Sequence, residues 1–446
     1  MKNFYNETYR WRNTISIDHS LLMFLWGLTV SFFPLGGIFG SLLVGPLADS
    51  CGRKGTLLIN NILAIVSAIL VSCSKAVRTY EFIIFSRLII GVCAGISFSV
   101  VPMYLTEIAP DNLRGAIGMM GHLFITFGSL VARICGLREV LGTQDGWPIL
   151  LSLTGLPALL QAILLPYFPE SPRYLLIQRK DKEAARQALK TLRDCDDVEG
   201  EIEDLHQEAL SESTEKEIDL FTIHRFEDVR RHLVSAIVLM GGQQLSGVNA
   251  AHHYAERLYQ STGLEDHIVG YIGMMISILL MFITLLAICV ADSSGRKTLL
   301  LTGLGFCSTS CILLAMSIEL QKTISWMSYF SSSFVIIFLI GQSVGPDPVL
   351  SVLIAELFLQ SSRSTAFVIG GCVHWLCKFL IGVAFLHLEI HIEPYSFLLS
   401  WPLCVATLIY SSKVIPETTG QSFLEIRRSV ALHVTRSLLL RQLAEN

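Results

Sequence analysis

The decapeptide DSCGRKGTLL at residues 49–58 is repeated almost unchanged as DSSGRKTLLL at residues 292–301. About 243 positions separate the two copies, and each copy lies beside a long apolar run. A duplicated ancestral gene would produce such a pair, and so would chance in a chain of low complexity. The sequence around the two copies decides between these explanations.

The composition of the chain is that of a helical membrane protein. Of its 446 residues, 52% are hydrophobic and 16% are charged, whereas soluble domains carry about 25% charged residues. Apolar runs such as 20–43 and 268–291 exceed the roughly 20 residues that a helix needs to cross a bilayer. No basic patch is interleaved with aromatic residues, so nucleic acid is not an expected partner. We therefore expect an all-α membrane protein whose partner is the lipid bilayer.

Eleven membrane spans are predicted, near residues 20–43, 56–74, 80–104, 116–137, 147–168, 232–259, 267–291, 297–319, 325–357, 364–387 and 394–413. A charged stretch with a helical pattern separates the first five spans from the last six. The predicted regions are an outer N-terminal segment (1–19), a first transmembrane half (20–168), a cytoplasmic helical loop (169–231), a second transmembrane half (232–413) and a cytoplasmic tail (414–446).

Two further motif pairs repeat in the same order as the decapeptides. Glu107 and Glu356 each precede an arginine by seven residues, and they lie about 249 positions apart. The tripeptide PES at 169–171 ends the first half, and PET at 416–418 ends the second. Three pairs at nearly one offset indicate two homologous halves around a midplane cavity, the architecture of many secondary transporters. Five spans against six indicate that one helix is missing at the N-terminus.

Basic residues predict the orientation of the chain, because Lys and Arg gather in cytoplasmic loops. Those on the predicted inner side are Arg53, Lys54, Arg114, Arg296, Lys297 and Arg363. They place the N-terminus outside and the C-terminus inside a multi-pass protein of the plasma membrane, or of an internal membrane if the chain is truncated. Asn6 begins a glycosylation sequon, Asn-Glu-Thr, on the predicted outer side.

The motifs together resemble those of the sugar-porter family of the major facilitator superfamily. They are both DxxGRK copies, RLIIG (87–91), PMYLTEIAPDNLRG (102–115), PESPRYL (169–175) and PETTG (416–420). GGQQLSGVNA (241–250), LFLQSSR (357–363) and VHWL (373–376) are similar to the facilitative hexose transporters, on the branch of the intestinal fructose carrier. The resemblance covers essentially the whole chain. It implies a major facilitator fold without its first helix, no cofactor, and uniport of fructose or glucose by alternating access.

The duplicated charges are expected to form a gate at the cytoplasmic ends of the helices. Ion pairs that join helices in one state and separate in the other provide a bistable contact, and the resemblance implies this use. The set consists of Asp49, Arg53, Arg87, Glu107, Arg114 and Glu170 in the first half, and of Asp292, Arg296, Glu356, Arg363 and Glu417 in the second. Interfacial anchoring is the alternative for any single charge, but matched sets in both halves favour the gate.

Amide and ring side chains are expected to bind the sugar, because amides offer hydroxyl groups both donors and acceptors. The predicted substrate-binding residues, several of them implied by the resemblance, are Gln243, Gln244, Asn249, His122, Gln342, His374 and Trp375. Trp375 is expected to offer a flat face for stacking. Helix packing through polar side chains is the alternative role.

A span is interrupted at GQSVGPDPVL (341–350), which contains Gly345, Pro346 and Pro348. Proline removes a backbone donor and bends a helix, so this segment is predicted to be a gating hinge. A bend that serves packing alone is the alternative.

Several residues depart from the fructose-branch pattern in or near the expected cavity. They are His122, Arg133, Gln342, Asp347, Lys378 and the pair His252 and His253. Ionisable residues inside spans are costly and indicate function by default, and extra cations could favour an anion or impair hexose binding. Three hypotheses remain: a facilitative hexose carrier, a truncated family member without transport, and a carrier of an organic anion. No nucleophile elbow, phosphate loop or metal-ligand spacing indicates an enzyme.

Overall fold

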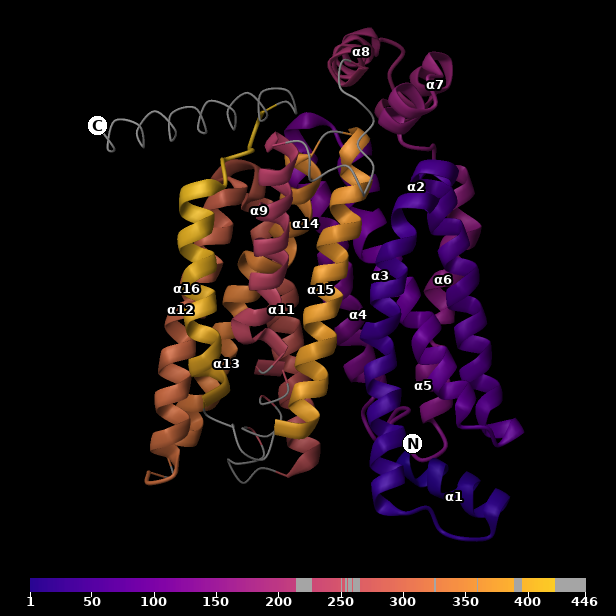
Figure 1. Ribbon diagram of the computed structural model, residues 1–446, viewed down its shortest axis with the longest axis vertical. Helices are drawn as coiled ribbons and strands as arrows, with labels where there is room; N and C mark the ends of the chain where they lie inside the picture. The colour runs from indigo at the N-terminus through magenta and orange to yellow at the C-terminus, as the bar shows by residue number, and fades with distance from the viewer. Residues whose placement is uncertain are drawn as a thin grey trace.

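The computed structural model describes residues 1–213, 227–249, 251–252, 255, 259, 265–324, 326–358, 360–388 and 395–421. Within these ranges the chain is helical and contains no strand. The long helices run roughly along the long axis of the molecule. They form two groups that lie side by side across this axis (Figure 1). His253 and the predicted tail beyond residue 421 lie outside the described residues.

The first group contains α2 (His19–Val77), α3 (Glu81–Ile108), α4 (Arg114–Cys135), α5 (Trp147–Ser152) and α6 (Gly155–Leu164). The second contains α9 (Glu227–Gln243), α11 (Asp266–Ser294), α12 (Arg296–Gln321), α13 (Met327–Val344), α14 (Pro346–Leu357), α15 (Gln360–Leu388) and α16 (Tyr395–Val414). At one end of the bundle lie α7 (Lys182–Arg193) and α8 (Glu199–Ser213), and at the other lies α1 (Lys2–Asn13) (Figure 1). The α7/α8 end and the α1 end are thus opposite ends of the molecule.

Nine of the described helices have the length and apolar composition to cross a membrane. The longest, α2, contains two predicted spans, 20–43 and 56–74, because its helical geometry is interrupted at Gly52. The predicted span 232–259 begins on α9 and continues into a π-helical turn at Gln244–Val248; part of its remainder lies outside the described residues. The other predicted spans fall on α3, α4, α5 with α6, α11, α12, α13 with α14, α15 and α16.

Two glycines interrupt the helices at the two copies of the repeated decapeptide. Gly52 has φ 76° and Gly295 has φ 89°, a region that side chains with a Cβ rarely adopt. A Cβ at Gly52 would also overlap the carboxylate of Glu170, and one at Gly295 would overlap the carboxylate of Glu417. The glycine of each DxxGRK motif therefore provides both the bend and the room for a carboxylate from the end of the same half of the sequence.

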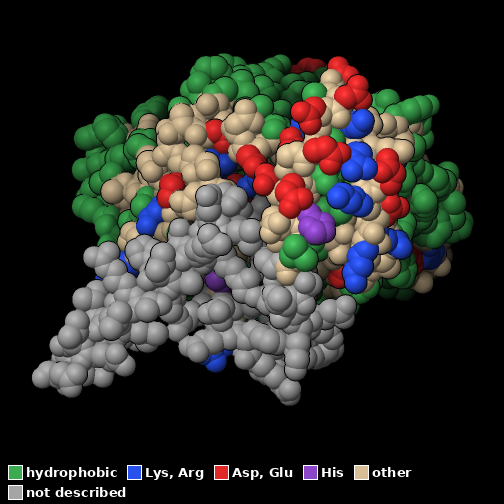
Figure 2. All heavy atoms as spheres, turned by 90° about the horizontal axis from the view of Figure 1, so that it is seen from above, with side chains coloured by type: hydrophobic (Ala, Val, Ile, Leu, Met, Phe, Trp, Pro, Cys, Tyr) green, Lys and Arg blue, Asp and Glu red, His purple; other side chains and the backbone are tan. Residues whose placement is uncertain are grey.

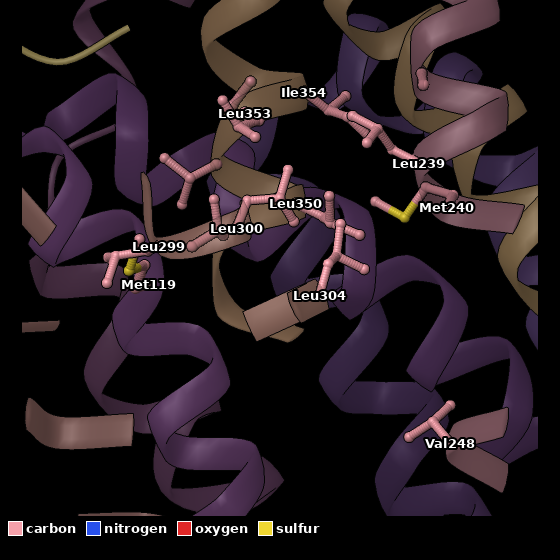
Figure 3. Close-up of a cluster of buried hydrophobic side chains, with 14 of the residues drawn as sticks. Met119, Leu239, Met240, Val248, Leu299, Leu300, Leu304, Leu350, Leu353 and Ile354 are labelled. Carbon is pink, nitrogen blue, oxygen red and sulfur yellow. The ribbon is translucent and has the colours of Figure 1, made fainter. Parts of the chain in front are cut away.

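The main hydrophobic core surrounds α14. Leu350, Leu353 and Ile354 are buried on this helix, which contacts α3 and α4 of the first group as well as α9 and α12 of the second. Figure 3 shows these side chains among Met119, Leu239, Met240, Val248, Leu299, Leu300 and Leu304. The two groups also contact each other through α2 with α15 and α4 with α11. The helix α14 thus touches both groups.

Charged and apolar side chains occupy separate parts of the surface. Seen from the α7/α8 end, acidic and basic side chains gather on this end of the molecule, and hydrophobic side chains form its left, upper and right margins (Figure 2). Large apolar side chains such as Phe24, Phe124 and Met275 are exposed along the length of the helices. Apolar exposure on this scale is expected where lipid, and not water, surrounds the helices.

Substitution of either motif glycine is expected to destabilise the fold. Gly52→Ala and Gly295→Ala each force a Cβ into a backbone conformation that costs roughly 1–3 kcal/mol, and each displaces the carboxylate that lies against the glycine. We expect a lower melting temperature in detergent, measured by fluorescence-detected unfolding. Gly128→Ala, on α4 with no atom near its Cβ position, is the matched control and should melt like the unaltered protein. Equal melting of all three variants would contradict the role given to the two motif glycines.

Candidate substrate cavity and the charged clusters beside it

The first charged cluster joins α2 and α3 to the segment after α6 at the α7/α8 end. Arg53 is fully buried and pairs with Glu107 at 3.0 Å. Glu170 accepts hydrogen bonds from the backbone amides of Arg53 and Lys54, at 3.1 and 3.2 Å. Ser171 donates its hydroxyl to Glu107. Glu170 thereby satisfies the free amides of the helix that restarts after Gly52, where a carboxylate is also favoured by the helix dipole.

The second cluster repeats this arrangement in the second group. Arg296 pairs with Glu356 at 3.3 Å. Glu417 accepts hydrogen bonds from the backbone amides of Arg296 and Lys297, at 2.9 and 3.2 Å. Thr418 donates its hydroxyl to Glu356 at 2.6 Å. The repeated motifs of the sequence therefore build the same constellation twice, with the hydroxyl residue after PE as a member that the sequence analysis did not include.

Side chains of the second group reach into the first cluster. Arg363 donates to Glu107 at 3.1 Å, and both side chains are fully buried. The hydroxyl of Ser364 donates to Asp49 at 3.2 Å. Asp49 also accepts from Gln178 at 3.2 Å. Residues at the start of α15, in the second group, therefore bond directly to the acidic residues of the first cluster.

The second cluster in turn contacts the first group, at the start of α4. Asp292 accepts hydrogen bonds from the backbone amides of Gly115 and Ala116, at 3.2 and 3.1 Å. Asp292 also pairs with Arg296 at 2.9 Å. A Cβ at residue 115 would overlap the guanidinium of Arg296, so glycine permits this close approach. Arg114 is buried beside it and pairs with Asp111 in the turn before α4.

The prediction that Arg87 belongs to this network is wrong. Arg87 follows Glu81 by six residues on α3, and Glu81 pairs with Arg12 of α1 at 2.5 Å. Glu107 lies about 20 residues further along the same helix, which corresponds to about 30 Å. Arg87 therefore lies towards the α1 end, near Tyr5. The sequence motif that contains Arg87 has no counterpart in the second half, and this missing repeat could have excluded it.

A cavity of about 480 Å³ lies between the two groups, within the size range of small-molecule sites. The predicted residues Gln243, Gln244, Asn249, His122, His374 and Trp375 line it, together with Asp347, His252 and Lys378. A smaller chamber of about 160 Å³ adjoins it and shares His122, His252 and Asp347. Gln342 and Arg133 line this smaller chamber. Every predicted substrate-binding residue thus faces one of the two spaces.

The amide side chains form two short chains of hydrogen bonds at the cavity. Asn249 Nδ2 donates to Gln244 Oε1 at 2.9 Å, and Gln244 Nε2 lies 3.2 Å from His374 Nδ1. Separately, Gln243 Nε2 donates to Asp347 Oδ1 at 2.8 Å. The helix of the second group that carries the three amides is thereby connected to α15 and to α14.

A π-helical turn brings two of the amides together. Gln244 and Asn249 are five residues apart, a spacing that places side chains on different faces of a regular α-helix. The chain forms a π-helical turn at Gln244–Val248, with Gly247 at φ 98°. The i to i+5 geometry of such a turn aligns the two side chains, and π-turns are frequent at functional sites. Gln342 Nε2 supports the turn by donating to Ser246 at 2.8 Å.

Trp375 is packed on several sides. Its indole lies against Gly37 of α2, where a Cβ would overlap the ring, and it meets Phe33 edge to face at 5.7 Å between centroids. The ammonium of Lys378 lies over the indole, 5.1 Å from the ring centroid. His374 stacks on Phe98 at 4.3 Å. The flat face predicted for sugar stacking is therefore covered by a cation in this conformation.

Several cavity-lining residues hold a buried polar atom without a partner. Among the described residues, no hydrogen bond is formed by Gln243 Oε1, His122 Nε2, Gln342 Oε1 or Trp375 Nε1. A buried polar group without a partner costs about 1–3 kcal/mol. Four such atoms around two connected spaces constitute a set of donors and acceptors for a polar ligand.

The predicted interruption at residues 341–350 is present. Gly345 has φ −127° and ψ −75° between α13 and α14, and Pro346 occupies the first turn of α14, where the lost amide has no cost. A Cβ at Gly345 would overlap the carbonyl oxygen of Leu299 on α12. Pro348 is buried in the same turn. The segment thus bends the chain beside the cavity, and its use as a hinge remains a prediction.

The glycosylation sequon lies on α1. Asn6 is exposed and its side chain accepts a hydrogen bond from the backbone amide of Ile17 at 3.3 Å. Thr8 of the same sequon is buried. Modification of Asn6 remains a prediction.

Two groups of helices around a polar cavity, with ion-pair clusters at one end, define a membrane transporter. The solved structure of the major facilitator proton:xylose symporter XylE bound to 6-bromo-6-deoxy-D-glucose is similar, with a TM-score of 0.81, 20% identity and coverage of 96% of this chain and 94% of that one. A partially occluded inward-open conformation of the xylose transporter XylE from E. coli gives 0.71, at 21% identity and 94% coverage of both chains. These likenesses show the fold, and the predicted all-α major facilitator fold is confirmed.

Sequence comparison identifies the family. The family described as "Sugar (and other) transporter" matches residues 1–429. "Solute carrier family 2, facilitated glucose transporter member 5" of Rattus norvegicus is 50% identical over 431 residues, 97% of this chain and 86% of the relative. Member 7 of Homo sapiens is 48% identical over 430 residues, 96% of this chain and 84% of the relative. The chain belongs to the sugar transporter family, and the predicted resemblance to the facilitative hexose transporters is confirmed.

Neutralising Glu107 is expected to loosen the α7/α8 end. Glu107→Gln leaves Arg53 and Arg363 buried without their shared carboxylate, and the loss of one partner of a buried pair costs about 3–5 kcal/mol. The amides of Gly115 and Ala116 are protected by the contact with Asp292. We expect their hydrogen exchange, measured by mass spectrometry in nanodiscs, to quicken at least tenfold.

Glu356→Gln is the matched control for this experiment. Glu356 has the same two kinds of direct contact, to Arg296 and Thr418 of its own group, and only its longer-range attraction to Arg114 reaches the other group. Its loss is expected to quicken exchange around the second cluster more than in residues 358–364, where Arg363 still holds Glu107. Identical exchange patterns in the two variants would contradict a special role for Glu107 between the groups.

Proposed function

We propose that this protein carries a hexose, fructose or glucose, down its concentration gradient across the plasma membrane. Membership of the sugar transporter family and relatives named as facilitated glucose transporters support this. The observation that carries the proposal is the polar set around the cavity. Gln244, Asn249 and His374 are hydrogen-bonded into a fixed array, and Gln243 and Trp375 add unpaired atoms. Pre-arranged amides suit a ligand with several hydroxyl groups.

The proposed mechanism is alternating access. In this conformation the contacts Glu107–Arg363, Asp49–Ser364 and Asp292 with the start of α4 join the groups at the α7/α8 end. Separation of these contacts would open the cavity at that end. The basic residues of both clusters lie at this end, which favours a cytoplasmic location for it. The bend at Gly345 joins α13 to α14, whose Asp347 and Ser351 line the cavity. A change of backbone angles at this bend would transmit the opening.

Transport is tested by uptake of labelled fructose and glucose into proteoliposomes that contain the full chain. We expect saturable counterflow without an imposed ion gradient. Gln244→Ala removes two hydrogen-bond partners from the array, each worth about 1 kcal/mol, and should lower hexose kcat/KM about tenfold or more. Gln207→Ala, an exposed glutamine on α8, is the matched control and should leave uptake unchanged.

Two results would contradict this proposal. A folded protein, verified by its melting transition, that shows no flux of any hexose would instead favour a family member without transport. Equal loss of uptake in Gln244→Ala and Gln207→Ala would show that the amide array has no particular part in binding.

A further inference from the structure

The two charged clusters differ in how the motif aspartate is joined to the motif arginine. In the second cluster, Asp292 pairs directly with Arg296 at 2.9 Å. In the first cluster, the amide of Gln178 lies between the corresponding residues. Gln178 Nε2 donates to Asp49 Oδ1 at 3.2 Å, and Gln178 Oε1 accepts from Arg53 Nη1 at 3.0 Å. An amide offers both a donor and an acceptor, so one neutral side chain binds the acid and the base together.

The same aspartate makes a contact with the second group. While Oδ1 of Asp49 is held by Gln178, Oδ2 accepts the hydroxyl of Ser364 at 3.2 Å. Ser364 is buried at the start of α15. A hydrogen bond at one oxygen fixes the plane of a carboxylate, and the plane determines where the other oxygen points. Gln178 therefore orients the hydrogen bond between Asp49 and Ser364.

Gln178 ends a π-helical turn, Tyr174–Gln178, which contacts α7 and α8 as well as α2 and α15. Leu176 of this turn belongs to a separate apolar cluster, together with Ala185, Leu189, Val198, Ile202 and Leu205. The hydroxyl of Tyr174 donates to the carbonyl oxygen of Asp49 at 3.3 Å. Turns of this type are frequent at functional sites. The turn thus connects the apolar cluster of α7 and α8 to Asp49.

We propose that Gln178 is a positioning residue for the closed α7/α8 end: it holds Asp49 against Ser364 and links this contact to the placement of α7 and α8. This inference rests on the proposed function, in which the contacts between the groups separate during the cycle. Its chemical content is the order of donor and acceptor on one amide. A role in packing alone would depend on the shape of the side chain and not on that order.

The first variant, Gln178→Glu, keeps the shape of the side chain and replaces the Nε2 donor with an acceptor. The new carboxylate can still accept from Arg53. It repels the carboxylate of Asp49, because like charges in contact are unfavourable, and it displaces that carboxylate from Ser364. The contact between the groups should therefore weaken although the size of the side chain is unchanged.

The readout is hydrogen exchange, measured by mass spectrometry on the full chain in nanodiscs. The amides of Gly115 and Ala116 are protected by Asp292, at another contact between the groups. Because Gln178 lies in the first cluster, these amides should respond only if the two groups separate more often. We expect their exchange to quicken about fivefold or more in Gln178→Glu. Gln187→Glu, the same change at an exposed glutamine of α7, is the matched control and should exchange like the unaltered protein.

A second change tests the order of donor and acceptor directly. Adding Asp49→Asn to Gln178→Glu exchanges the carboxylate and the amide between the two positions. The amide at position 49 can then donate to the carboxylate at position 178, and its oxygen can accept the hydroxyl of Ser364. We expect exchange at the start of α4 to return to within about twofold of the unaltered protein. The melting temperature of each variant shows whether it is folded.

The outcomes separate this inference from the proposed function. Unchanged exchange at Gly115 and Ala116 in folded Gln178→Glu overturns the inference, and so does exchange that quickens only within residues 174–178. Equal quickening in Gln178→Glu and in the doubly altered protein also overturns it, because the order of donor and acceptor then has no effect. Quickening that the second change reverses supports it. Hexose uptake by the unaltered protein is measured separately: its absence contradicts the proposed function, and the exchange results still decide the role of Gln178.

Discussion

The α7/α8 end of the molecule depends on one buried carboxylate, that of Glu107. It lies between two fully buried guanidinium groups, Arg53 of its own group at 3.0 Å and Arg363 of the other group at 3.1 Å. Removing three charges from water is costly, and their attraction offsets that cost only while the geometry is kept. Such a cluster is weak evidence that the fold is stable. It instead favours one conformation, because its favourable geometry exists in only one arrangement of the two groups of helices.

The two charged clusters share their main internal contacts, but their contacts with the opposite group of helices differ in chemistry. Each has a glycine with positive φ, a carboxylate that binds the next two backbone amides, and an arginine paired with a second carboxylate. The motif aspartates extend this symmetry across the two groups. Asp49 accepts from the side chain of Ser364, the residue after Arg363. Asp292 accepts from the backbone of Gly115, the residue after Arg114. A duplicated sequence has thus produced reciprocal contacts of two chemical kinds.

The sequence alone predicted those features of the fold that depend on composition or on the repeated motifs. The apolar runs predicted the spans, and the duplicated motifs predicted which acids and bases meet within each half. Arg87 was misplaced although the predicted span 80–104 put it near the end opposite Glu107, and although its motif has no repeat in the second half. The contact of Ser364 with Asp49 was missed because its repeat, Gly115 with Asp292, is formed by a backbone amide and leaves no matching side chain in the sequence. The π-turn at Gln244–Val248 also escaped prediction, because regular helical periodicity separates the amides that the turn brings together.

The complete burial of Arg363 has a consequence for the proposed cycle. Its guanidinium is bonded to Glu107, to the side chain of Gln360 and to the carbonyl of Phe358, and it has no exposed surface. When the groups separate, water must enter to hydrate the charges that lose their partners. In the proposed cycle, opening would therefore be a hydration event as well as a separation of the two groups. Solutes too large to enter the gap, which lower the activity of water, would hold the transporter in the conformation described here.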